Sequence, residues 1–195
     1  MTKTRGERGF SVIEVVVVVA VIVILSAVAI PSFINSSRIY RLNSATTSVQ
    51  NLFELGRMNA VRRNKKISVN RDVVGGRTRL FVDLAGTGAY VNTDPSFLLP
   101  ADMQLNPSGA PASSTTGLTN MQTLGTTGCI GFDSRGTVAY GTVGASTCGT
   151  AGTAVNWFVS VGLTTSTSWF RAVTVTPMGQ AKAWTGSYGG NWYAQ

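Results

Sequence analysis

One carboxylate, that of Glu14, lies inside an apolar run that begins at Phe10 and continues to Ile30. Insertion scales assign comparable charged residues at the centre of a membrane helix a cost of roughly 2.5 to 3.5 kcal/mol, so such a group normally has a partner. If the chain were cut between Gly9 and Phe10, the new terminal amine would lie about one helical turn before Glu14. The amine could then meet the same carboxylate on an adjacent copy. The spacing therefore predicts charge pairing between subunits as the chemistry of this segment.

Enzymatic chemistry has little support in the sequence. The chain contains no histidine, which is the commonest general base and metal ligand near neutral pH. It has no phosphate-binding loop, no Cys/His cluster and no strained nucleophile turn. Asp94 and Asp102 adjoin proline-marked turns, where aspartate commonly hydrogen-bonds its own backbone. We therefore expect a protein that is not an enzyme and that uses no cofactor and no metal.

The elements that must position Glu14 are a leader and a long helix. Residues 1–9 carry three basic side chains and one acidic one, and basic residues stay on the cytoplasmic side during insertion. A helix over residues 10–33 would be about 36 Å long, enough to cross a hydrocarbon core of about 30 Å. The apolar region of a secretory signal is shorter, at about 7 to 15 residues. A plain single-span anchor would leave Glu14 unexplained.

The stretch Arg8-Gly9-Phe10-Ser11-Val12-Ile13-Glu14, followed by the apolar run and Pro31, resembles the class III leader of type IV pilins and pseudopilins. The resemblance implies that a prepilin peptidase cuts after Gly9 and methylates Phe10, and that Glu14 guides docking into a growing filament. It also implies a single-pass inner-membrane protein with its C-terminal domain in the periplasm. The implied partners are that peptidase, other pilins or pseudopilins and an inner-membrane assembly platform.

Pro31 lies near the end of the apolar run. Inside a helix, proline removes a hydrogen bond and clashes with the preceding turn, so we expect a kink or a locally melted turn there. In the pilin family, a proline at this place softens the helix for packing in the filament. The alternative, that Pro31 only marks the exit from the membrane, remains open.

Residues 34–66 form the amphipathic half of the predicted helix. Apolar or small side chains recur there every three or four positions, which predicts a face that packs on a folded domain. They are Leu42, Ala45, Val49, Leu52, Phe53, Gly56 and Ala60. A basic cluster follows, made of Arg62, Arg63, Lys65 and Lys66. These cations either complement the helix dipole or form a patch for phosphate or an acidic partner.

Residues 67–195 contain short stretches rich in β-branched and aromatic residues, separated by glycine and proline. These stretches predict strands, so we expect an α+β fold in which the long N-terminal helix packs on a small antiparallel β-sheet domain. Residues 106–128 are mostly Ser, Thr, Gly and Ala, which predicts a flexible surface loop. Cys129 and Cys148 would face an oxidising compartment, so we expect a disulfide worth roughly 3 kcal/mol. Two buried thiols are the alternative.

Three further segments, residues 59–63, 131–138 and 173–180, resemble the minor branch of the pilin family, which includes the H pseudopilin of type II secretion and the T and U minor pilins. The resemblance implies a subunit near the tip or priming complex of a type IV pilus or a type II secretion pseudopilus. The DNA-uptake members carry a Gly-Arg-x-Arg motif near the C-terminus. Here residues 179–182 keep only one cation, Lys182, so the sequence supports DNA as a partner only weakly. A DNA-binding minor pilin and a major structural pilin are the alternatives.

Overall fold

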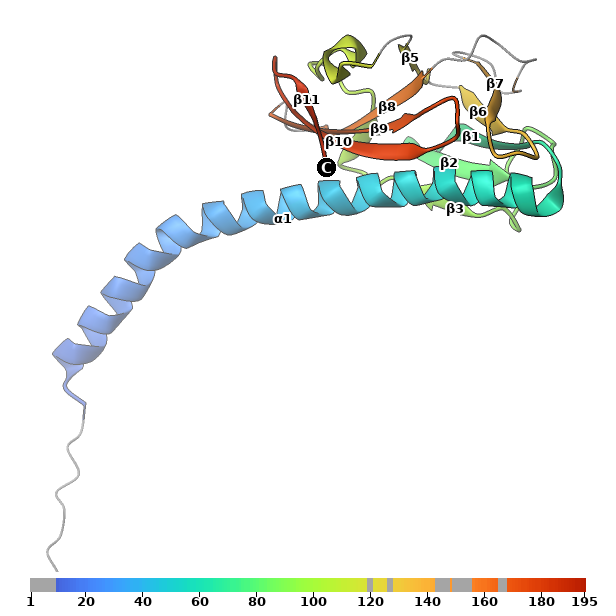
Figure 1. Cartoon of the computed structure of the whole chain (residues 1–195). Helices are drawn as coiled ribbons and strands as arrows, with labels where there is room; N and C mark the ends of the chain where they lie inside the picture. Colours follow the sequence, from blue (N-terminus) through green and yellow to red (C-terminus); the bar gives the residue numbers. More distant parts are fainter. Residues whose placement is uncertain (1–9, 119–120, 126–127, 143–147, 149–155, 165–167) are drawn as a thin grey trace, which may run out of the picture. The chain divides into compact units, whose positions relative to one another are not determined.

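The computed structural model describes residues 10–118, 121–125, 128–142, 148, 156–164 and 168–195 (Figure 1). The chain divides into two compact units, one that ends at Tyr40 and one that comprises Arg41–Gln195. A single long α-helix, α1 (Val12–Arg63), begins in the first unit and ends in the second. The predicted α+β class is confirmed, because a long N-terminal helix packs through its second half on antiparallel sheets.

The first unit consists of the apolar part of α1. By length and composition, this helix is able to cross a membrane, and its most apolar window has no buried residue. The helix begins at Val12, two residues after the expected start at Phe10. Pro31 lies inside α1, which continues beyond it. The kink at Pro31 stays a prediction.

The second half of α1 is the first layer of the folded unit. The apolar stripe predicted from the sequence is buried in full, with Thr46 added to it. Thr46 tolerates burial because its hydroxyl donates to the carbonyl oxygen of Leu42 at 2.8 Å. The helix ends through its backbone: Asn64 has φ of 50°, and the Lys65 amide donates to the Ala60 carbonyl at 3.2 Å. This left-handed cap satisfies a terminal carbonyl through the backbone.

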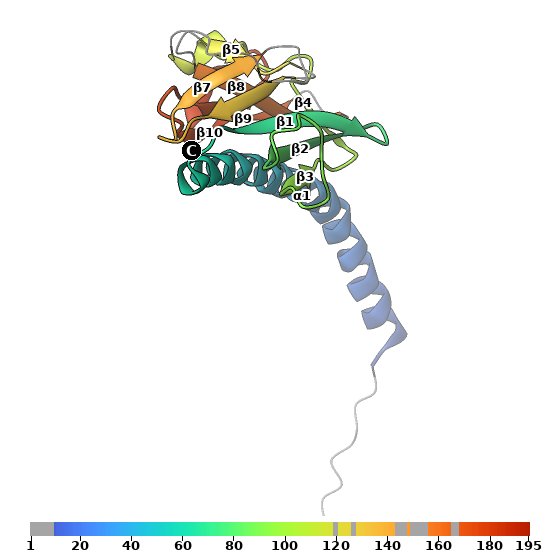
Figure 2. The same cartoon turned by 90° about the vertical axis from the view of Figure 1, so that its right-hand side faces the viewer.

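Two sheets pack against this half of α1 and form the predicted antiparallel β-sheet domain (Figures 1 and 2). The first sheet has the order β3 (Ser96–Leu98), β2 (Arg77–Asp83), β1 (Ile67–Val74), β6 (Cys129–Phe132), β7 (Val138–Thr142). The second has the order β11 (Trp192–Ala194), β10 (Ala181–Ser187), β9 (Trp169–Val175), β8 (Asn156–Leu163), β4 (Met103–Leu105). Neighbouring strands in these orders are antiparallel.

The main hydrophobic core joins the helix to both sheets. It contains the buried stripe of α1 and side chains from strands of each sheet, including Val69, Phe132 and Val173. A second cluster is built on Phe158, Phe170, Ala172, Trp184 and Trp192. Since alternate residues of a strand point to opposite faces, Phe170 and Val173 place the two clusters on opposite faces of β9. The central strands β8 and β9 of the second sheet are therefore buried on both faces.

The segment 106–128, which we expected to be a loop, contains two short elements in its described part. These are a 3₁₀ helix, η1 (Ser113–Thr116), and β5 (Met121–Thr123), which pairs with β8 in parallel. Leu118 and Met121 from this segment pack on the second cluster. A segment of mainly small residues therefore covers one face of the second sheet.

Candidate assembly segment and its anchorage

The proposed assembly residues lie where α1 begins. Gly9 lies outside the described residues, and the side chain of Phe10 is exposed. The backbone amides of Glu14 and Val15 donate to the carbonyl oxygen of Ser11 at 3.0 and 3.3 Å, so the first helical turn starts directly after Ser11. Glu14 therefore lies in that first turn, where the positive end of the helix dipole favours a carboxylate.

The apolar side chains around Glu14 have no cover within their own unit. From Phe10 to Ile34, the large hydrophobic residues have exposed fractions between 45% and 81%. Contiguous apolar surface of this extent marks contact with a membrane or with other protein chains. A cation brought to Glu14 by such a neighbour would meet a carboxylate already oriented by the helix. The segment can thus hold a chain in lipid and offers one charged group for a specific contact.

Polar contacts fix the second half of α1 to the two sheets. Gln50 donates from Nε2 to the Ala181 carbonyl at 3.2 Å, and the Ala181 amide donates to Oε1 of Glu54 at 3.0 Å. One turn further, Nε of Arg57 donates to the Gly136 carbonyl at 3.1 Å. These bonds hold the β9–β10 turn and the β6–β7 turn against one face of the helix.

The same two turns meet each other beneath Arg57. The Val138 amide donates to the Pro177 carbonyl at 2.9 Å. Gly136 and Gly179 have φ of 79° and 76°, and a Cβ at Gly179 would lie 2.0 Å from the Gly136 carbonyl oxygen. Residues 131–138 and 173–180, which the sequence singled out as separate motifs, are therefore two halves of one junction.

Asp133 shapes the β6–β7 turn. Its Oδ1 accepts hydrogen bonds from the backbone amides of Arg135 at 2.9 Å and Thr137 at 3.0 Å. Burial alone would raise the pKa of the Asp133 carboxyl, but the bonds from Thr137 and Arg135 outweigh burial and hold the pKa below its usual value. The turn is thus organised around an ionised carboxylate.

The predicted basic cluster lies at this end of the unit. Arg62 and Arg63 are in the last turn of α1, Lys65 and Lys66 follow it, and all four are exposed. Arg57 lines one surface depression with Arg62 and a neighbouring one with Lys182. Arg57 thus lies between Arg62 of the cluster and Lys182, and the binding role of the cluster stays a prediction.

Arg135 is a further basic residue that sequence reasoning missed. It is adjacent to Gly136, whose carbonyl accepts the hydrogen bond from Arg57, and its side chain is 86% exposed. No local pattern marks Arg135 as part of the cluster, because it is 72 positions beyond Arg63 in the chain. We call the whole set the basic end; it comprises Arg57, Arg62, Arg63, Lys65, Lys66, Arg135 and Lys182. Within this set, Arg57 forms an ion pair with Glu54, and Arg135 forms one with Asp133.

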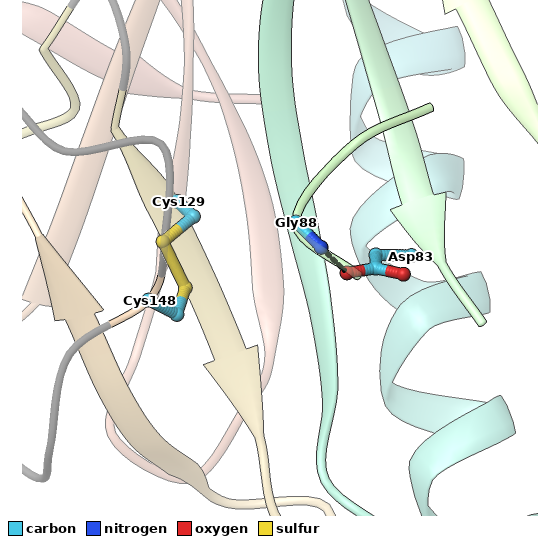
Figure 3. Close-up of a disulfide and its surroundings, with 4 residues drawn as sticks. All are labelled: Asp83, Gly88, Cys129 and Cys148. Carbon is cyan, nitrogen blue, oxygen red and sulfur yellow. Dashed lines mark hydrogen bonds between the residues drawn. A yellow bond between two sulfur atoms is a disulfide. The ribbon is translucent and has the colours of Figure 1, made fainter. Parts of the chain in front are cut away.

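The predicted disulfide between Cys129 and Cys148 is present in the structure, with Cα atoms 5.6 Å apart (Figure 3). Cys129 begins β6 and is buried in the folded unit. The bond therefore ties a central strand of the first sheet to the chain segment that precedes β8. It closes a loop between residues 19 positions apart.

The two aspartates considered in the sequence lie in different surroundings. Asp94 accepts hydrogen bonds from the amides of Val91 at 2.9 Å and Leu84 at 3.2 Å, so its expected role in a turn is confirmed. Asp102 instead forms an ion pair with Arg41 at 2.8 Å. Asp83 has a role similar to that of Asp94, because three successive amides bond to its carboxylate, among them that of Gly88 (Figure 3).

Residues 4–30 match the family described as the prokaryotic N-terminal methylation motif. The chain therefore carries a type IV pilin-like signal, of the kind found on proteins that are processed as prepilins. The match covers the leader and the apolar run, which together with the exposed helix fit anchoring in a membrane. No curated protein and no solved structure matches this chain.

Proposed function

We propose that this chain is a minor pilin or pseudopilin, a subunit that is cut by prepilin peptidase and assembled into a type IV pilus or a type II secretion pseudopilus. The observation that carries the proposal is the position of Glu14. Within a methylation motif, it is the one acid of an exposed apolar helix, and it lies in the first turn. On this proposal, the chain acts through assembly rather than by converting a substrate.

The mechanism follows from the chemistry of the helix N-terminus. Cleavage after Gly9 creates a positive amine on Phe10, and methylation of that amine keeps it charged. Apolar helices of neighbouring subunits then pack side by side in the filament, where the surroundings exclude water and strengthen electrostatic attraction. The carboxylate of Glu14 pairs with the amine of a neighbour and sets the register between the two helices. The folded unit remains outside the membrane, on the periplasmic side.

The direct test replaces Glu14 with Ala in the full chain. Removal of one partner of a buried ion pair costs about 3 to 5 kcal/mol, so we expect incorporation into filaments to fall on the order of 100-fold or more. Cleavage and methylation, followed by mass spectrometry, should persist. Val15→Ala is the matched control, because it shortens the adjacent apolar side chain without removing a charge. Equal recovery of the Glu14→Ala variant in sheared filaments would contradict the mechanism.

A deletion strain distinguishes the two machines. Loss of surface pili, restored by complementation, would assign the chain to a type IV pilus. Normal pili together with a defect in protein secretion would assign it to a pseudopilus. Abundance in sheared filaments separates the minor role that we propose from that of a major structural pilin, because a tip or priming subunit is rare.

Binding of DNA is a second candidate function, and the basic end favours it. The fold adds Arg57 and Arg135 to the predicted cations, so that seven basic residues belong to the basic end. Such a patch binds phosphate with an affinity that falls steeply as the salt concentration rises. The test is binding of duplex DNA to the full chain in detergent. Arg62→Ala and Arg135→Ala should weaken binding and reduce its salt dependence, whereas Arg38→Ala, at an exposed position outside the basic end, should not.

A further inference from the structure

The end of the folded unit at which α1 enters carries several exposed apolar and aromatic side chains. Val73 and Val74 are 62% and 42% exposed, Trp169 is 45% exposed and Tyr188 is 67% exposed. Arg41, the first residue of the unit, is at the same end, with about half of its side chain exposed. We call these five residues the entry face.

Backbone and side-chain bonds hold the loops of this end together. Arg41 forms its ion pair with Asp102, whose carbonyl accepts a hydrogen bond from the Thr164 amide at 2.9 Å. Thr164 directly follows β8, so the end of β8 and Arg41 are both bonded to Asp102. Nε of Arg77, at the start of β2, donates to the Leu99 carbonyl at 2.8 Å. The β1–β2 turn is thus bonded to the chain segment that leads to Asp102.

The aromatic residues belong to the same end. Trp169 begins β9 and is paired with Ser187, the last residue of β10. Tyr188 comes directly after Ser187, so the two exposed aromatic residues lie at neighbouring strand ends. Arg171, two residues into β9, donates from Nε to Oδ1 of Asn43 at 2.7 Å. This bond places the start of β9 beside the first turn of α1 in the unit.

The two valines are held out by a tight turn. Val74 pairs with Arg77, and Gly75 and Gly76 between them have φ of 57° and 75°. Two consecutive residues with positive φ form the turn that best fits the twist of a two-stranded hairpin. A Cβ at either glycine would have no atom within 4 Å, so the tip stands clear of the rest of the unit. An apolar tip of this kind is unfavourable in water and favourable at a lipid surface.

The composition of the entry face fits the boundary between lipid and water. Trp and Tyr gather there because one part of the ring is apolar and another part forms hydrogen bonds. Arginine guanidinium groups bind phosphate through bidentate hydrogen bonds. Arg41, which is paired with Asp102, and Arg77 are cations at this end with accessible surface. Arg79 pairs with Asp72 beside the hairpin tip. Arg171 adds a further positive charge that is buried, and burial lowers its pKa.

Chain connectivity keeps the entry face near the membrane. Arg41 is eight positions beyond Phe33, the expected end of the membrane helix. Because α1 is helical across this connection, the distance is about 12 Å at a rise of about 1.5 Å per residue. Chain connectivity therefore keeps Arg41, the first residue of the entry face, within a short distance of the expected membrane exit.

We propose that the entry face rests on the anionic phospholipid surface of the membrane before the subunit enters a filament. Val73, Val74 and Trp169 would dip into the interface, and Arg41 would contact phosphate groups. This proposal requires the anchoring by α1 that underlies the proposed function, and it adds a second, reversible contact between the folded unit and the same bilayer. The contact would be broken when the subunit is extracted.

The test uses the full chain in nanodiscs that contain phosphatidylglycerol, with a nitroxide quencher on the lipid headgroup. The chain has three other tryptophans, Trp157, Trp184 and Trp192, and all three are buried. Their emission is removed by subtracting the spectrum of the Trp169→Phe variant, which leaves the emission of Trp169. We expect the headgroup nitroxide to quench most of the Trp169 emission, and acrylamide in the water to quench little of it. Quenching by acrylamide but not by the nitroxide would overturn the proposal.

Two variants and one lipid change sharpen the result. The double variant Val73→Asp/Val74→Asp should lose most of the nitroxide quenching, because it adds two negative charges to the hairpin tip. Met178→Asp is the matched control: Met178 is also exposed, but it lies in the β9–β10 turn at the opposite end of β9. Equal quenching in phosphatidylcholine discs would contradict the role of anionic lipid. If the chain fails to co-purify with the discs, anchoring itself is contradicted, and the proposed function fails first.

Discussion

The two units of this chain share one helix, whose apolar side chains are exposed in the first unit and partly buried in the second. Before Tyr40, the helix exposes nearly all of its apolar side chains and carries one acid, so its energetics depend on what surrounds it. From Arg41 onward, the same helix buries a regular stripe against two sheets and is fixed by side-chain bonds to their turns. The difference teaches that one continuous helix can serve as an interface in its first half and as a scaffold in its second.

The largest expected effect comes from two phenylalanines on α1. Phe53 is 1% exposed and Phe33 is 75% exposed. Phe53→Ala should lower the free energy of unfolding of the second unit by about 3 to 5 kcal/mol, because it removes buried surface and leaves a cavity. Phe33→Ala should leave that value unchanged. Denaturation followed by tryptophan fluorescence measures this cleanly, because all four tryptophans are in the second unit. Equal losses in both variants would show that the units do not behave separately.

The disulfide supplies the next largest effect. The double variant Cys129→Ala/Cys148→Ala should lose about 3 kcal/mol of stability, because the unfolded chain regains the freedom that the closed loop removes. The same denaturation measurement applies, with the wild-type protein under reducing conditions as a second arm. Membrane insertion and peptidase cleavage should be unaffected, since both depend on the first unit. A variant that is no longer cleaved would break the separation between the units.

Gly179 tests whether the junction under Arg57 is fixed by close contact. Gly179→Ala combines positive φ with a Cβ that would lie 2.0 Å from the Gly136 carbonyl oxygen. Gly76→Ala is the matched control, with φ of 75° against 76° and nothing within 4 Å of the added Cβ. The control should cost about 1 kcal/mol through backbone strain alone, and Gly179→Ala should cost about 2 to 3 kcal/mol. Equal losses would show that the turns shift apart easily.

The same division explains what the sequence predicted well. Local patterns along the chain predicted three features: the apolar run, the long helix and the buried stripe from Leu42 to Ala60. Such patterns can be seen in a single stretch of sequence, because they depend only on residues a few positions apart. The disulfide followed from there being only two cysteines in a segment expected to face an oxidising compartment. Gly9, Phe10 and the pairing of Glu14 depend on a peptidase and on other subunits, so they stay predictions.

Contacts between distant segments could not be predicted in this way. The second sheet and the position of β5 depend on pairings such as Met121 with Asn156, which leave no periodic pattern in either segment. Arg135 joins the basic end only because its turn is bonded to Arg57. Small side chains in residues 106–128 suggested a flexible surface loop, yet Leu118 and Met121 pack on the second cluster.

The smallest predicted effect concerns pH. The pKa of Asp133 is lower in the folded chain than in the unfolded chain, so the folded state is favoured by the ionised carboxylate. This contribution is complete above the unfolded pKa and is lost as the pH falls through the folded pKa. Asp133→Asn should therefore cost about 1 kcal/mol at neutral pH, the order of one hydrogen bond, and less as the medium is acidified. Denaturation curves of both proteins at a series of pH values measure the difference. A gap that is constant with pH would show that the turn depends on the oxygen acceptor and not on its charge.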